Sequence, residues 1–197
     1  MKYPDFFETI KPIKLKDELS EVLGAFEGGV IHFTYLDVVK SAGHSCPTIA
    51  GAYLMVREGL KALYGEALPQ RGDIKVLFKE DILNGTTGVV ANVFSLITGA
   101  TSNWGFKGLN GAYDRRFLMF FNADIPLHVR LQRNDTGRAI DIAYNPSSIL
   151  PDPQMQPLMQ KVLAGVTSVE EKELFGLLWQ TRVRKILENF DKVILLQ

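Results

Sequence analysis

The spacing of apolar residues along the chain alternates between the helical repeat and the two-residue repeat of strands. Residues 1–27 predict a helical lead-in, because apolar side chains recur there at helical spacing: Leu15, Leu19, Val22, Leu23 and Phe26. Residues 30–35 are β-branched and aromatic and predict a strand that carries His32. A short helix is expected over residues 35–41, ending before Gly43.

The segment 47–64 gives the clearest helical pattern of the chain. Its apolar stripe is Ile49, Tyr53, Val56, Leu60, Leu63 and Tyr64. Pro47 suits the first helical position and Gly65 suits the stop. A strand is expected over 74–78. A helix is expected over 84–97, where the many Val and Ile residues leave a strand as the alternative.

The third quarter of the chain predicts antiparallel strands. Residues 116–121, 127–133 and 139–144 are strand candidates, and Asn134–Gly137 is a hairpin turn signal between the last two. Residues 145–157 contain four prolines and form a linker, after which Ser168 and Glu171 fit a capping box that opens a long helix to about Phe190. We therefore expect an α+β fold with a mixed or mainly antiparallel sheet. Residues 1–150 would form the α+β domain and 151–197 a helical extension of it.

Composition narrows the class of protein. The chain has 197 residues, 46% of them apolar, with 22 basic and 22 acidic residues. A net charge of zero argues against nucleic-acid binding, which usually needs a basic excess. No apolar run is long enough to span a bilayer, and the charged N-terminus lacks a signal-peptide core, so a cytoplasmic protein without membrane contact is expected. The single cysteine, Cys46, permits no intrachain disulfide.

Candidate chemistry centres on the stretch Gly43–Gly51. Cys46 stands directly before Pro47, which places the sulfur at or beside the N-cap of the predicted helix. Unpaired backbone N–H groups and the helix dipole favour a thiolate there. His44 lies two residues earlier, and zinc accepts sulfur and imidazole together. The alternative interpretation is a cysteine buried as a small hydrophobe.

A glycine-rich loop over residues 99–111 is the second candidate. Such a loop can approach a ligand closely and offer backbone N–H groups, and an ordinary tight connection is the alternative. Its candidate ligand-binding residues are Thr101, Asn103, Trp104 and Lys107.

The motif Gly43-His44-Ser45-Cys46-Pro47, opening a helix with Ala50-Gly51-Ala52-Tyr53, resembles the FmdE family of proteins related to formylmethanofuran dehydrogenase. The ending Ile97-Thr98-Gly99-Ala100-Thr101 and the loop from Gly105 to Gly108 fit the family more loosely. The resemblance covers roughly residues 30–145. It implies an α+β domain, zinc or another divalent transition metal at the His/Cys motif, and a homodimer. The family name refers to an enzyme that fixes carbon dioxide onto methanofuran.

The chain departs from the family pattern at the metal motif. Ala42 stands where the family typically has a second histidine, and no further cysteine or cysteine-rich C-terminal zinc module is present. The resemblance carries over His44 and Cys46 as metal ligands. His32 is the candidate for a third, ahead of Asp37, Asp81 and Asn84.

Three functions follow from these patterns. The first is zinc-type metal binding at His44, Cys46 and His32, with the activity unassigned and an enzyme neither required nor excluded, since no general base is evident. The second is a metal-free module for small-molecule binding or subunit assembly, with a pocket between the helix at 47–64 and the loop at 99–111. The third is a thiol enzyme that uses Cys46 with His44 as base.

Overall fold

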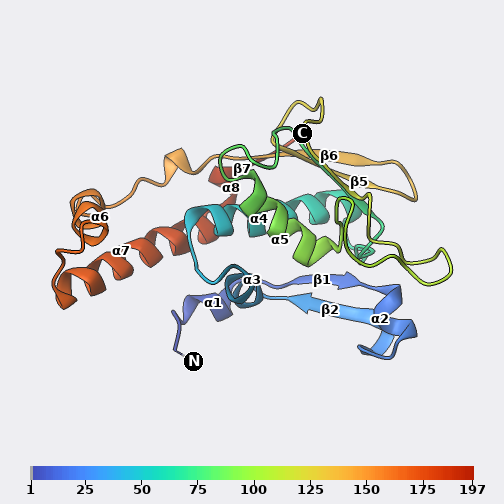
Figure 1. The fold of residues 1–197 in the computed structure, drawn as a ribbon, viewed down its shortest axis with the longest axis horizontal. Coiled ribbons are helices and arrows are strands. Elements are labelled where there is room, and N and C mark those ends of the chain that lie inside the picture. The colour runs from blue at the N-terminus through green and yellow to red at the C-terminus, as the bar shows by residue number, and fades with distance from the viewer. Residues whose placement is uncertain (1) are drawn as a thin grey trace.

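Helix α4 (Pro47–Tyr64) is the element around which the rest of the chain packs in this computed structural model, which describes residues 2–197 (Figure 1). Twelve of its 18 residues are buried, including both its apolar stripe and its small residues. A helix that is buried to this degree must pack against other elements on opposite faces. A five-stranded sheet, helix α5 (Thr87–Thr98) and helix α7 (Val169–Glu188) cover much of it, and the N-terminal segment with α3 (Tyr35–Ala42) packs on it as well. The sequence predicted a helix, with a strand as the alternative, for the Val- and Ile-rich segment that forms α5, and the helix is confirmed.

The five-stranded sheet is mixed, and its strand order is β4-β3-β5-β6-β7. Strand β3 (Ile74–Phe78) pairs in parallel with β4 (Met119–Phe120) and antiparallel with β5 (Val129–Arg133). Strand β6 (Ala139–Tyr144) pairs antiparallel with β5 and with β7 (Ile194–Leu196). The predicted strands at 74–78 and 139–144 are therefore present, the one at 127–133 begins at Val129, and only Met119–Phe120 of the one at 116–121 is a strand. The predicted α+β fold is confirmed.

The N-terminal segment differs from the predicted helical lead-in. It forms α1 (Phe6–Thr9), β1 (Ile13–Lys16), α2 (Glu18–Val22) and a 3-10 turn (Glu27–Gly29), and β1 pairs antiparallel with β2 (Val30–Phe33). The prediction was wrong at 13–16 because Ile13 and Leu15 alternate with lysines and point into the core, as in a strand. The Tyr53 hydroxyl on α4 lies within hydrogen-bonding distance of the carbonyls of Lys11 (2.9 Å) and Phe33 (3.1 Å), which share its one proton and hold this hairpin on α4.

Helix α3 (Tyr35–Ala42) joins the hairpin to α4. Thr34 and Asp37 form a capping box at its start, and Gly43 at φ 75° ends it. Gly43 takes the left-handed conformation at low cost because it has no Cβ.

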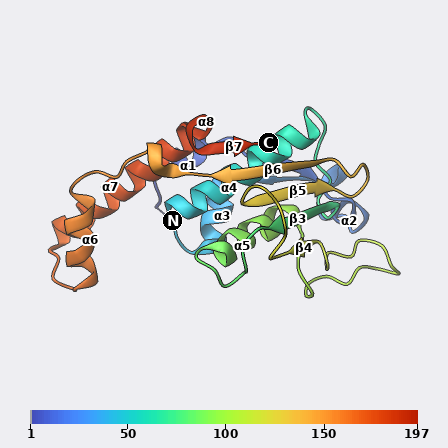
Figure 2. The same cartoon turned by 90° about the horizontal axis from the view of Figure 1, so that it is seen from above.

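The C-terminal part contains α6 (Met155–Leu163), α7 (Val169–Glu188) and α8 (Phe190–Val193), followed by β7. Figures 1 and 2 show α6 and the first half of α7 as an arm that projects from the body. The second half of α7 buries Val183, Ile186 and Leu187 in the core. The capping box at Ser168 is confirmed, whereas β7 was not foreseen because its pairing partner, β6, lies about fifty residues earlier. Across residues 2–197, no helix has the length and hydrophobicity to cross a bilayer.

Candidate functional site

The turn between α3 and α4 holds Cys46 as the sequence predicts. Cys46 is the N-cap of α4, and its Sγ accepts the N–H of Ile49 at 3.4 Å. Pro47 occupies the first helical turn. The side chain is half-buried and unpaired with any other sulfur, since the chain has one cysteine. A sulfur in this position receives a backbone donor in place of water.

Distant elements hold the backbone of this turn. The carbonyl of Ser45 accepts hydrogen bonds from Trp179 Nε1 (2.9 Å) and Gln180 Nε2 (3.2 Å), both on α7. The carbonyl of Pro47 accepts the Tyr144 hydroxyl of β6 at 2.7 Å. Helix α7 and the sheet therefore position the motif, a role that the sequence alone did not indicate.

Two phenols lie next to this turn and are held protonated. The Ser45 hydroxyl is 2.9 Å from the Tyr35 hydroxyl, and both side chains are buried. Burial raises the pKa of Tyr35 and of Tyr144 well above that of an ordinary phenol. Both remain neutral hydrogen-bonding groups at physiological pH: Tyr35 bonds to the Ser45 side chain and Tyr144 to the Pro47 carbonyl, and neither is a base.

His44 is exposed, and its tautomer follows from its neighbour. Nδ1 lies 3.0 Å from the carbonyl oxygen of Ala42, which can only accept, so Nδ1 carries a proton. In the neutral ring Nε2 then has the free lone pair. A backbone carbonyl that orients a histidine in this way is typical of histidines that bind a metal or accept a proton through Nε2.

A cavity of about 400 Å³ lies beside His44, between α3, the start of α4, α5 and the loop after α5. Its lining is Val38, Ser41, Ala42, His44, Ile49, Val89, Asn92, Val93, Ser95, Leu96 and Trp104. Apart from the imidazole, no lining side chain is ionisable. Such a cavity favours a small uncharged molecule with a few hydrogen-bonding groups and an apolar face.

Only one of the four predicted loop residues lines this cavity. Trp104 does so, with 57% of its surface exposed. Thr101 is buried, and its hydroxyl lies in hydrogen-bonding reach of the carbonyls of Trp104 and of Arg115 (2.7 Å), so it braces the loop. Asn103 and Lys107 are exposed and do not line the cavity.

Helix α5 supplies lining residues that were not predicted. Val89, Asn92, Val93 and Leu96 follow helical i, i+3, i+4, i+7 spacing and therefore lie on one face. A polar Asn92 within an otherwise apolar face was the signal in the sequence that could have identified this wall.

The three predicted metal ligands are not gathered into a site. Among residues 2–197, no three His, Cys, Asp or Glu side chains lie together in a way that could hold a metal ion. His32 is exposed on β2, opposite Lys14 of β1. The chain thus offers His44 and Cys46 from one turn, without a third ligand from His32, whereas catalytic zinc generally has three protein ligands.

The family model described as FmdE, molybdenum formylmethanofuran dehydrogenase operon, matches residues 42–195. This match spans the turn, α4, α5, nearly all of the five-stranded sheet and the arm, which is well over half of the 197-residue chain, whereas the cavity residues Val38 and Ser41 of α3 lie outside it. The chain belongs to the FmdE family. The match begins at Ala42, so the β1–β2 hairpin lies outside it. None of the curated proteins matches the chain.

Proposed function

We propose that this FmdE-family chain binds a small, uncharged molecule in the cavity beside His44. The observation that carries the proposal is the convergence of one oriented imidazole, the Asn92 amide and the Trp104 ring on a cavity of about 400 Å³. The imidazole offers a hydrogen-bond acceptor at Nε2, Asn92 offers both a donor and an acceptor, and Trp104 offers an apolar wall. A planar ligand with one amide or ring-nitrogen group suits these partners.

Metal binding is the second candidate, and the tautomer of His44 favours it. With Nδ1 donating to the Ala42 carbonyl, Nε2 is the nitrogen available to zinc, and Cys46 adds a sulfur two residues away. Zinc takes four ligands, so the remaining ones would come from water or a bound molecule. A thiol enzyme receives less support, because Cys46 does not line the cavity and its Sγ bonds to Ile49 N.

Titration of ¹⁵N-labelled protein with benzamide and benzoate tests the cavity. We expect benzamide to shift the indole signal of Trp104 saturably, and benzoate to bind at least several-fold more weakly because no lining cation receives its charge. Asn92→Leu removes one hydrogen-bonding partner, so the dissociation constant should rise about two- to tenfold. Lys107→Gln, outside the lining, is the control and should bind as the parent does. Equal affinity of the parent and Asn92→Leu would contradict the proposal.

The same protein, purified with zinc and then dialysed, tests the second candidate. Retained zinc in the parent and in His32→Ala, but not in Cys46→Ala or His44→Ala, would support a two-residue zinc site. Negligible zinc in all four proteins would contradict zinc binding by this chain and would not affect the proposal for the cavity.

We further propose that two copies of the chain associate through their arms. Helix α7 exposes Glu170, Leu177 and Arg184, spaced seven residues apart and so aligned along one stripe. When two such helices run antiparallel about a two-fold axis at Leu177, each Glu170 faces the partner's Arg184. Leu177 has 65% of its surface exposed, and a Cβ on Gly176 would meet no atom of residues 2–197 within 4 Å, which leaves room for a second helix at this point.

Charge exchange tests this pairing. Glu170→Arg should shift the chain toward monomer in sedimentation velocity, because Arg residues would then face each other. The double variant Glu170→Arg with Arg184→Glu should restore the dimer. If the parent chain is monomeric at high micromolar concentration, the proposal that the arms form a dimer is wrong.

A further inference from the structure

A groove of about 650 Å³ lies at the opposite end of α4 from the cavity beside His44. The start of β1, the last turns of α4, the segment 65–69 and Phe190 of α8 form its walls. An α-helix rises about 1.5 Å per residue, so Arg57 and Lys61, which line the groove, lie about 12 and 18 Å along α4 from Ile49, which lines the cavity. The groove shares no lining residue with the cavity.

Positive charge gathers in this groove although the whole chain is neutral. Four cationic and two anionic side chains line it. Arg57 and Glu58 pair with each other at 2.6 Å. Lys11, Lys14 and Lys61 make no ion pair with any part of residues 2–197, so three cations face one remaining carboxylate, Glu66.

Apolar surface lies directly beside these cations. Leu68 is 39% exposed and Phe190 is 37% exposed, and both line the groove. The Arg57 guanidinium stands over the Phe190 ring at 5.0 Å, which holds the ring in place. Exposed apolar side chains next to unpaired cations match a molecule with an apolar chain and an anionic head.

From this charge and apolar surface we propose that the groove is a binding site for an amphiphilic anion, that is, a short alkyl chain ending in a carboxylate or a phosphate monoester. The alkyl chain packs on Leu68 and Phe190, and the head accepts hydrogen bonds from Lys14 and Lys61. This site is independent of the function proposed for the cavity.

Calorimetric titration with octanoate, hexyl phosphate, octyl glucoside and octylammonium, each below its micelle concentration, tests the site. Octanoate or hexyl phosphate should bind saturably, and the tighter of the two identifies the head group. The neutral and cationic amphiphiles should bind at least several-fold more weakly. Raising the salt from about 20 to about 500 mM should weaken anion binding, because solvent-exposed charges are screened.

Matched variants separate charge from apolar contact. The double variant Lys14→Gln with Lys61→Gln should weaken binding of the anion about fivefold, as expected for two exposed ion pairs. Lys79→Gln with Lys172→Gln, which removes two lysines outside the groove, should leave binding unchanged. Leu68→Ser should weaken it without loss of charge. Absence of saturable binding, equal affinity for octyl glucoside, or unchanged affinity in the Lys14/Lys61 variant would each overturn the proposal.

Discussion

Replacing Asp17 by Asn is expected to lower the free energy of unfolding by about 3–5 kcal/mol, because it leaves two guanidinium groups without their counter-charge. The Asp17 carboxylate is buried and accepts from Arg71 Nη1 at 2.8 Å and from Arg115 Nη2 at 2.7 Å. It also caps α2 by accepting the Ser20 N–H. Urea denaturation of the parent and the variant at pH 7 measures the difference.

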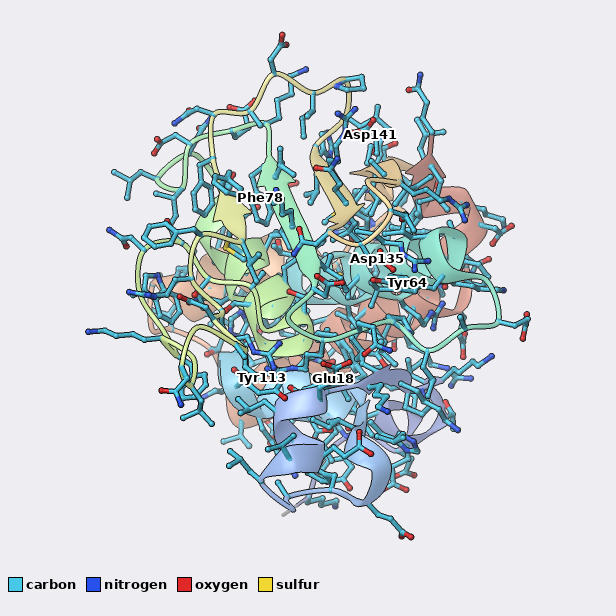
Figure 3. The ribbon with its side chains drawn as sticks, turned by 90° about the vertical axis from the view of Figure 1, so that its right-hand side faces the viewer. Glu18, Tyr64, Phe78, Tyr113, Asp135 and Asp141 are labelled. Atoms are coloured by element: carbon cyan, nitrogen blue, oxygen red, sulfur yellow. The ribbon has the colours of Figure 1, made fainter. Side chains whose placement is uncertain are left out.

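This cluster ties together four parts of the fold. Asp17 lies between β1 and α2, Arg71 precedes β3, and Arg115 lies in the long loop before β4. Arg71 also donates to the carbonyls of Leu96 and Ile97 near the end of α5. Glu18 and Tyr113 line a small cleft beside the cluster and are labelled in Figure 3. Asp135→Asn, which breaks an exposed ion pair with Arg133, is the control and should leave stability unchanged within error.

The same cluster predicts a pH dependence. Burial raises the pKa of Asp17, but the Arg71 hydrogen bond and the Arg115 charge outweigh it and hold the pKa below the ordinary value. A lowered pKa in the folded state stabilises the protein above the unfolded pKa of about 4, and this contribution disappears as the pH falls through the folded pKa. The gap between the parent and Asp17→Asn should therefore narrow below about pH 4. A gap that is constant from pH 7 to pH 2.5 would show that folding does not lower the pKa of Asp17.

Gly51→Ala is expected to destabilise the protein by about 1–3 kcal/mol, although alanine is the better helix former. A Cβ at this position would lie 2.5 Å from Cδ1 and Cζ of the Tyr144 ring. The ring cannot move away freely, because its hydroxyl bonds to the Pro47 carbonyl. Thermal and urea denaturation measure the loss.

Two variants distinguish overpacking from helix propensity. Gly176→Ala places the same change in α7, where no atom lies within 4 Å, and should stabilise the chain slightly. In a Tyr144→Leu background the cost of Gly51→Ala should largely disappear, since the ring is gone. If Gly51→Ala costs the same in both backgrounds, contact with Tyr144 is not the cause.

Local signals predicted most elements near the site. The stripe of 47–64, with Pro47 at its start and Gly65 at its end, predicted α4 with its observed bounds, and Cys46 is its N-cap as expected. These predictions succeeded because caps, helix starts and apolar periods depend on neighbours within a few residues. The N-terminal helix failed because β1 exists only by pairing with β2, and α2 and a 3-10 turn separate the two strands along the chain.

The predicted ligand residues were brought together only in part, because contacts between distant segments decide which side chains share a site. Spacing alone brought His44 and Cys46 into one turn, but His32 stands on β2 opposite Lys14 and does not join them in a group that could hold a metal. Trp104 reaches the cavity, whereas Asn103 and Lys107 follow the loop away from its lining.

The sequence by itself determined the helix that begins at Pro47, the sulfur at its N-cap and the family to which the chain belongs. Only the tertiary structure decided what surrounds the turn that carries this sulfur. Trp179 and Gln180 reach Ser45 from more than 130 positions away, and Asn92 lines the same cavity as His44 from another helix. Contacts of this range depend on how the helices pack on the sheet, and the apolar pattern specifies that a face is buried without specifying what covers it.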